Sequence, residues 1–183
     1  ITNPATPGSY AITINAGVDN GTITQNIITD DTVSVSATVQ QSLTFVISTS
    51  TIYFGTLGTG GAKFASSTNT SGDTLETIAH TLSVSTNAPS GYNMSIRGQT
   101  LTSQQNASNT ITAMGSPAAS STPNIAEQFG IRATVSGGTG ATIDATFSQA
   151  TSYGYDGTAT TSASFASGTG ATNVSTYSLR YVA

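Results

Sequence analysis

The feature that most constrains this chain is the repeated alternation of apolar and small polar residues in short runs. In residues 32–39, Val or Ala occupies every second position and Ser or Thr lies between. Such alternation is typical of a half-buried β-strand. About ten short runs of strand type recur at intervals of roughly 8–15 residues, with glycine-rich turns between them. This pattern predicts an all-β fold, namely an antiparallel β-sandwich of the immunoglobulin-like or jelly-roll-like kind.

The composition favours strands over disorder. Of the 183 residues, only four are Lys or Arg and eight are Asp or Glu, whereas 36% are hydrophobic. Disordered chains combine low hydrophobicity with high charge, so this chain does not fit that class. Ser and Thr together make up 61 residues, and Thr with Val, Ile, Tyr and Phe is favoured in strands. A chain of this length can bury a core without disulfides, and it contains no Cys.

The charge pattern argues against several classes of function. With a single Lys and a net charge of −4, the chain offers no basic surface for a nucleic-acid backbone. No apolar run reaches the roughly 18 residues of a membrane helix, and no signal peptide is recognisable. The first residue is Ile1 rather than Met, so we expect a processed or excised product. The Ser/Thr-rich, weakly charged composition is similar to that of secreted proteins, which predicts an extracellular, cell-surface location.

Two features of the sandwich are predicted from its central runs. Residues 43–47 are the more apolar of two neighbouring runs, so we expect a central strand there. Residues 75–85 and 92–96 both alternate and are separated by Asn-Ala-Pro-Ser-Gly, which predicts a β-hairpin. Tyr92, Met94 and Ile96 are expected to face inward. A single helical turn is expected at 124–127.

The N-terminal stretch is predicted to be a separate arm, residues 1–31, followed by a β-sandwich domain, residues 32–183. A turn from Pro4 to Gly8 leads into a strand of about residues 9–16, in which Tyr10, Ile12 and Ile14 alternate with smaller residues. Pro and Gly before it prevent the strand from continuing backwards. An isolated strand is not stable in water. It must therefore add to a sheet edge, either its own or that of a neighbouring subunit.

Four stretches of the chain resemble a family of secreted bacterial surface β-sandwich domains, common in candidate-phylum bacteria and similar to WxL-like surface domains. They are Val39–Phe45, Leu82–Tyr92, Gln99–Ser103 and Glu127–Ile131. The resemblance covers roughly residues 32–183, and its motifs are packing and turn motifs, so it implies a fold rather than an activity. The Trp-x-Leu signature is absent because the chain has no Trp. Attachment to peptidoglycan is therefore not implied.

The same resemblance bears on the two ends of the chain. Domains of this kind end on a strand of the type Tyr-x-x-x-Tyr-Val-Ala, then a short proline turn and a last strand beginning Ser-Tyr. Here Tyr181-Val-Ala stands at the C-terminus, and the turn and last strand are similar to residues 3–14. The resemblance implies donor-strand complementation between copies, which generates a filament. One repeat of a longer tandem surface protein, and return of residues 9–16 to the same sandwich, are the alternatives.

The predicted function is therefore a structural subunit of an extracellular, pilus-like filament, with copies of itself as partners. The expected donor strand consists of Tyr10, Ala11, Ile12, Thr13 and Ile14. The expected acceptor groove consists of Val33, Val35, Leu179, Tyr181 and Val182. The alternative is a monomeric adhesin-like module that binds a glycan or a protein. It would use an exposed cluster of Tyr53, Tyr92, Tyr153 and Tyr155.

Residues with catalytic potential are few, and no enzyme activity or cofactor is predicted. His80 is the one imidazole and shares a strand face with Ile78 and Leu82, which favours a partly buried, hydrogen-bonded histidine. The carboxylates are scattered, so no catalytic pair is indicated. Lys63 is a candidate for an isopeptide crosslink to an Asn or Asp, beside Glu76 or Glu127. Asp30–Asp31 is a candidate for calcium binding, although a plain turn is the simpler interpretation.

Surface modification is a further possibility. Glycosylation sequons occur at Asn20, Asn69, Asn93, Asn106 and Asn173. Several are expected by chance in a chain that is one-third Ser and Thr. The three arginines, at 97, 132 and 180, fall on outward strand positions and are expected to serve solubility or subunit contacts.

Overall fold

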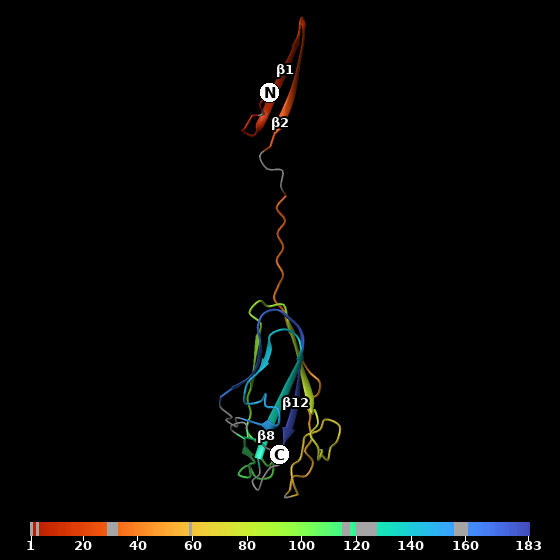
Figure 1. Ribbon diagram of the computed structural model, residues 1–183, viewed down its shortest axis with the longest axis vertical. Coiled ribbons are helices and arrows are strands. Elements are labelled where there is room, and N and C mark those ends of the chain that lie inside the picture. The colour runs from red at the N-terminus through yellow and green to blue at the C-terminus, as the bar shows by residue number, and fades with distance from the viewer. Residues whose placement is uncertain are drawn as a thin grey trace. The chain divides into compact units, whose positions relative to one another are not determined.

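The computed structural model describes residues 2, 4–28, 33–58, 60–114, 118–119, 128–155 and 161–183. Within these ranges the chain is all-β and contains no helix, and every strand pair except one is antiparallel. The predicted fold class is confirmed. The chain divides into two compact units, Ile1–Val39 and Gln40–Ala183, called here the N-terminal unit and the sandwich unit (Figure 1). This division follows residue 39, whereas the sequence predicted one after residue 31. The helical turn expected at 124–127 lies outside the described residues.

The N-terminal unit contains a β-hairpin of β1 (Gly8–Ala16) and β2 (Asp19–Ile27). The two strands pair along their whole length across a two-residue turn that begins at Gly17, whose φ is +67°. Two-residue hairpin turns of this kind favour positive φ and therefore glycine. The strand predicted at 9–16 is thus present, but it is not isolated. Its partner is the stretch that follows it in the sequence.

Residues 33–39 also belong to the N-terminal unit and form no strand in the structure. Val33, Val35 and Val39 are 84%, 88% and 80% exposed. The half-buried strand expected at 32–39 is therefore not formed by residues 33–39, and Thr32 lies outside the described residues. A strand needs a neighbour that takes up its backbone N–H and C=O groups. Among the described residues no strand pairs with this stretch, which we call the extended segment.

The sandwich unit is built from two main sheets and one small ribbon. The larger sheet has the order β3 (Leu43–Ile47), β4 (His80–Thr86), β12 (Thr172–Val182), β8 (Gln128–Gly137) and β6 (Thr112–Ala113). The smaller sheet has the order β5 (Tyr92–Ile96), β11 (Ala163–Gly168) and β9 (Ala141–Ile143). A further ribbon pairs β10 (Ser152–Tyr153) with β7 (Ala118–Ala119).

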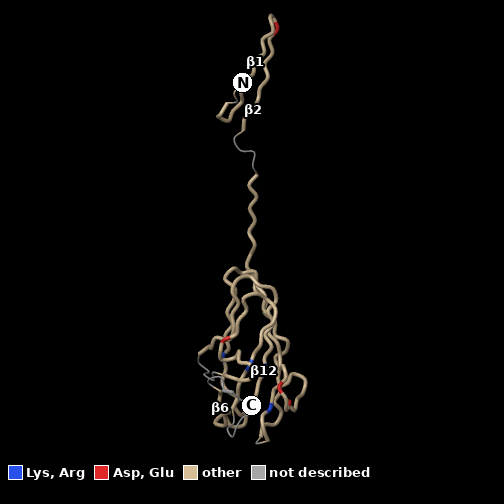
Figure 2. Tube along the Cα trace, viewed as in Figure 1, with Lys and Arg blue, Asp and Glu red and all other residues tan. Residues whose placement is uncertain are grey.

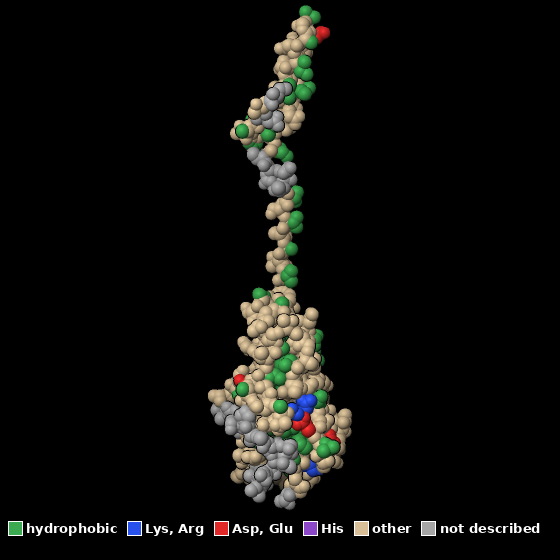
Figure 3. All heavy atoms as spheres, in the orientation of Figure 1, with side chains coloured by type: hydrophobic (Ala, Val, Ile, Leu, Met, Phe, Trp, Pro, Cys, Tyr) green, Lys and Arg blue, Asp and Glu red, His purple; other side chains and the backbone are tan. Residues whose placement is uncertain are grey.

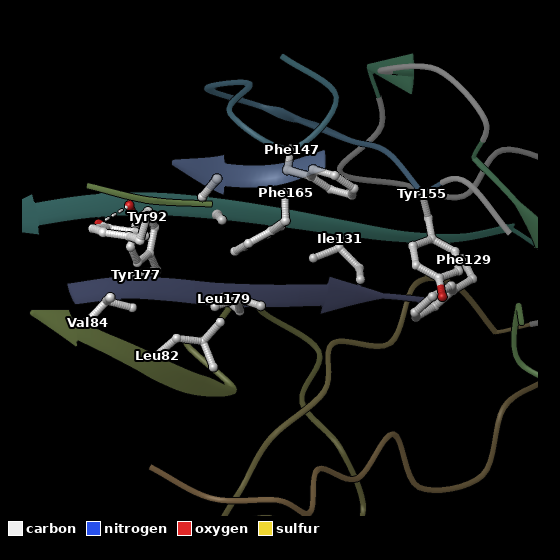
Figure 4. Close-up of a cluster of buried hydrophobic side chains, with 12 residues drawn as sticks. Leu82, Val84, Tyr92, Phe129, Ile131, Phe147, Tyr155, Phe165, Tyr177 and Leu179 are labelled. Atoms are coloured by element: carbon white, nitrogen blue, oxygen red, sulfur yellow. Dashed lines mark hydrogen bonds between the residues drawn. The ribbon is translucent and has the colours of Figure 1, made fainter. Parts of the chain in front are cut away.

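The core lies between the two main sheets (Figure 4). Tyr92 of β5 and Tyr177 of β12 meet there through their hydroxyl groups, which lie 2.7 Å apart. The ring of Phe165 on β11 lies 6.2 Å from that of Tyr177. The smaller sheet therefore covers β12 from across the core. Alternate residues are buried along β4, at 82, 84 and 86, and along β12, at 175, 177 and 179, as the alternating sequence predicts.

The connection between β4 and β5 differs from the prediction. These strands belong to different sheets, so residues 75–96 do not form a hairpin. The turn at residues 87–91 carries the chain across the core, and Gly91 makes this possible with a φ of +73°. A Cβ atom at Gly91 would lie 1.9 Å from the backbone oxygen of Gly168. The inward direction of Tyr92 is confirmed, because its side chain is buried in the core.

Candidate functional site

The most unusual surface of the sandwich unit is its edge at β3. This strand pairs with β4 on one side, and the sheet order has no described strand on its other side. The prediction that residues 43–47 form a central strand was wrong. Local apolarity indicated burial, but burial of a strand depends on which elements lie across from it.

One face of β3 points toward the core side and is nevertheless uncovered. Phe45 pairs with Val84, and directly paired residues of antiparallel strands project on the same face. Val84 is 2% exposed, whereas Phe45 is 49% exposed. Leu43 and Ile47 lie on the same face as Phe45 and are 60% and 48% exposed. These three side chains form what we call the β3 face.

The smaller sheet is too narrow to cover the β3 face. Its outermost strand on this side is β5, which contacts β12 through the Tyr92 and Tyr177 hydroxyls. The larger sheet continues beyond β12 through β4 to β3. No described strand of the smaller sheet continues beyond β5. The sandwich is therefore incomplete above β3, and an apolar surface that belongs to a core position meets solvent.

The backbone of β3 is also free along this edge. The amide of Asn87 donates to the Ser42 carbonyl at 3.4 Å, and the Ser48 amide donates to the Thr81 carbonyl at 3.0 Å. Hydrogen-bonded pairs alternate along an antiparallel ladder, so positions 44 and 46 also face β4. The N–H and C=O groups of Leu43, Phe45 and Ile47 then point to the open edge. The same three residues offer both an apolar face and a backbone ready for pairing.

The chain enters β3 through a fixed segment. The side chain of Asn87 accepts a hydrogen bond from the Ser42 amide at 2.7 Å and donates one to the Gln40 carbonyl at 2.9 Å. The hydroxyl of Thr86 donates to the Ser42 carbonyl at 2.7 Å. Residues 40–42 therefore continue the line of β3 beside the end of β4. No sequence signal indicated this role for Asn87, because its partners lie more than forty residues away.

The predicted acceptor groove is not formed by the residues named for it. Leu179, Tyr181 and Val182 lie in β12, which pairs with β4 on one side and β8 on the other. Near its end the backbone of Phe64 forms a bridge to Val182, and the side chain of Val182 is fully buried. A donated strand therefore finds no open edge at β12. Val33 and Val35 are not part of the sandwich unit at all.

The predicted donor residues form one strand of the N-terminal hairpin. Tyr10, Ile12 and Ile14 share a face with Ile23 of β2, because Ile12 pairs with Ile23. Ile12, Ile14 and Ile23 are 47%, 60% and 57% exposed. The intervening residues Ala11 and Thr13 belong to the opposite face. Hydrophobic side chains also line one side of the extended segment (Figure 3). Both parts of the N-terminal unit thus expose an apolar face.

The tyrosine cluster required for the adhesin-like alternative is not on the surface. Tyr92, Tyr153 and Tyr155 are buried, and only Tyr53 is substantially exposed, at 39%. Tyr155 instead packs against Phe129, with ring centres 4.9 Å apart. These tyrosines belong to the core and are not available to an external glycan or protein.

His80 is a partly buried, hydrogen-bonded residue, as predicted. Its Nε2 atom lies 2.6 Å from the hydroxyl of Tyr181, and the two rings stack with centres 5.6 Å apart. Burial lowers the pKa of His80 below its ordinary value of 6.5. Its Nδ1 atom is buried and has no hydrogen-bond partner among the described residues. The arrangement supports a structural role for the imidazole.

The two arginines of the larger sheet meet a single carboxylate in one cluster. Arg132 and Arg180 pair directly across β8 and β12, and both bind the carboxylate of Glu76. The hydroxyl of Tyr153 donates to the same carboxylate. Burial and Glu76 raise the pKa of Tyr153, although Arg132 opposes this. Two of the predicted outward arginines therefore stabilise the sheet surface.

The structure gives little support to the other candidate sites named from the sequence. Glu76 is engaged by arginines rather than by Lys63, whose backbone pairs with Ala183. Glu127 and Asp30–Asp31 lie outside the described residues. The five sequon asparagines are all exposed, which leaves glycosylation a prediction. In the described ranges, no cluster of three or more His, Asp or Glu side chains is placed to bind a metal.

A shallow hollow on the outer side of the sandwich unit is lined by Thr44, Ser85, Asn87 and Asn173 among others. No described helix has the length and apolar character needed to span a membrane.

Comparison with known proteins found no matching family model, no matching curated protein and no matching solved structure.

Proposed function

We propose that this protein is the repeating subunit of an extracellular filament, in which each copy docks its N-terminal unit on the incomplete sandwich of the next. The observation that carries the proposal is the β3 face. Leu43, Phe45 and Ile47 project on the core side of the sheet and are each about half exposed or more. A soluble monomer gains nothing from leaving such residues open, and an open apolar edge strand invites pairing with another chain.

The N-terminal unit has the character of a partner for this face. Its exposed apolar residues alternate with polar ones, so it can offer one apolar face and a strand backbone together. Its described part carries one charged residue, Asp19, at the tip of the hairpin (Figure 2). Residues 33–39, and residues 4–28 apart from Asp19, contain no charged side chain, so burying them against an apolar surface costs no desolvation of a charge.

The geometry of such a contact favours a filament over a closed dimer. The donating surface belongs to residues before 40 and the accepting surface to β3, so the two surfaces differ. A contact between different surfaces leaves one of each free on every pair of subunits. Further copies then add at both ends. The extracellular location is supported by the composition, which is weakly charged and rich in Ser and Thr.

The test is negative-stain microscopy of the purified full chain beside two single substitutions in β3. Phe45→Asp places a carboxylate on the β3 face. Thr44→Asp places the same group on the opposite face of the same strand and serves as the matched control. We expect filaments from the unmodified chain and from T44D, and monomers with unchanged circular dichroism from F45D.

Two results would count against the proposal. If the unmodified chain stays monomeric at high concentration, the protein is not a self-assembling subunit. If F45D forms filaments as readily as T44D, assembly does not use the β3 face.

A further inference from the structure

We infer that the strand seated on the β3 face is the extended segment, residues 33–39, of a second copy of this chain. This inference rests on the proposed function and specifies its contact. The sequence alone pointed to Tyr10–Ile14 as the donated strand. In the structure those residues already pair with β2, whereas residues 33–39 have no described strand partner. The chain thus holds one unpaired strand sequence and one unpaired strand edge.

The two elements match in length. The ladder between β3 and β4 extends from Ser42 to Ser48, since both residues make backbone hydrogen bonds to the β4 side. Residues 33–39 provide a run of equal length. A strand added along the open edge can therefore satisfy the N–H and C=O groups of Leu43, Phe45 and Ile47 from end to end.

The two elements also match in pattern. Apolar side chains occupy positions 33, 35, 37 and 39 of the extended segment, and positions 43, 45 and 47 of β3. When the extended segment pairs with β3, one of its faces lies on the same side as the β3 face. If the apolar positions of the extended segment are on that side, its valine side chains lie beside Phe45 and extend the core. The polar series then faces solvent together with Thr44. Neither segment contains a charged residue.

A second copy is a better donor than the same chain. Residues 33–39 are followed directly by residues 40–42, so a return onto the chain's own β3 needs a tight turn at 40–42. The side chain of Asn87 holds the Gln40 carbonyl and the Ser42 amide, and the Asn87 amide holds the Ser42 carbonyl. These bonds keep residues 40–42 in line with β3. A turn there would break all three.

Engineered disulfides in the full chain test the contact, because the natural sequence contains no Cys. The principal variant carries Val35→Cys and Phe45→Cys. Positions 33 and 37 are tested in place of 35, since the register of the added strand is not fixed by the pattern. The matched control is Ser36→Cys with Phe45→Cys, and Phe45→Cys alone controls for symmetric contacts. A rival variant carries Ile12→Cys and Phe45→Cys.

Each variant is assembled, checked for filaments, oxidised mildly and separated by non-reducing electrophoresis. Opposed side chains on neighbouring strands have Cβ atoms about 4.5–5.5 Å apart, close enough for a disulfide after a small adjustment. We expect a ladder of reducible multimers from one of the apolar-series pairs. The S36C pair should give no more than the dimers of F45C alone.

The other outcomes separate this inference from the proposed function. A ladder from the I12C pair alone would show that the hairpin occupies the β3 face, which overturns the inference and leaves the filament intact. A crosslink within one chain would assign the extended segment to its own sandwich. Filaments with no ladder from any pair would show that the extended segment does not lie on the β3 face, which overturns the inference. An unmodified chain that forms no filaments would remove the proposed function itself.

Discussion

The hydroxyl groups of Tyr92 and Tyr177 lie 2.7 Å apart in the core and join the two main sheets of the sandwich unit. Tyr177 also donates a longer hydrogen bond, 3.5 Å, to the carbonyl of Ser167 on β11. Three strands from two sheets are thus connected by two hydroxyls in an otherwise apolar region. Burial, with a smaller contribution from Tyr92, raises the pKa of Tyr177. The Tyr177 hydroxyl is therefore neutral at physiological pH.

Removing one of these hydroxyls should weaken the sandwich. We expect Tyr177→Phe to lower the free energy of unfolding by about 1–2 kcal/mol, because the Tyr92 hydroxyl is left buried without its partner. The double variant with Tyr92→Phe should cost less than the sum of the two single changes. Tyr53→Phe, at a substantially exposed tyrosine outside the named strands, is the control and should change little. Urea denaturation gives the free energy of unfolding of all four variants. Strictly additive losses in the double variant would show that the two hydroxyls do not interact.

The stability should fall in mildly acidic solution because of His80. Its pKa is lowered by burial, so the folded state binds a proton less readily than the unfolded chain. The full stability is therefore present above the ordinary pKa of 6.5 and is lost progressively as the pH falls below it. His80 is the only histidine. His80→Gln should flatten the dependence of unfolding free energy between about pH 7 and about pH 5; an unchanged slope would assign it to another group.

The charge cluster on the larger sheet should depend on Glu76. In Glu76→Gln, Arg132 and Arg180 remain opposite one another on neighbouring strands without a carboxylate between them. We expect the unfolding free energy to fall by about 1–3 kcal/mol, given that the group is partly exposed. Asp19→Asn, at the exposed tip of the hairpin, changes the net charge equally and should have little effect. Equal melting temperatures for the two variants would contradict this assignment.

The entry into β3 should loosen when Asn87 is changed. Asn87→Ala removes the two side-chain hydrogen bonds to Gln40 and Ser42. We expect a loss of about 1–2 kcal/mol and faster hydrogen exchange at the Ser42 amide. Asn93→Ala, at an outward position of β5, is the matched control. If exchange at Ser42 is unaltered, residues 40–42 are held by other contacts.

Local sequence pattern was sufficient for the directions of side chains along the strands. Tyr92, Met94 and Ile96 were expected to point inward from their alternation with polar residues; Tyr92 is buried, and Met94 and Ile96 pack partly buried against the core. Alternation is a property of neighbouring residues, and in a strand it determines which face each side chain takes. The partly buried environment of His80 followed from the same reasoning.

Pairing of strands was not predictable in the same way. The turn before Gly91 indicated a hairpin, yet it connects two different sheets. The strand β4 pairs with β3 and β12 in the larger sheet, whereas β5 pairs with β11 in the smaller one. The apolar run Leu43–Ile47 indicated a central strand, yet it lies at an edge. In both cases the outcome depends on strands more than thirty residues away, which contribute no local signal.

The sequence by itself determined that this protein is all-β, weakly charged and built from alternating strands, because those properties depend on residue type and on the spacing of near neighbours. Only the tertiary structure decided which strands share a sheet and which remain unpaired. Edge and centre are relations between distant segments, set by the packing of the whole core. The uncovered β3 face is such a relation, and so is the lack of a described strand partner for residues 33–39. The proposed assembly rests on these two features.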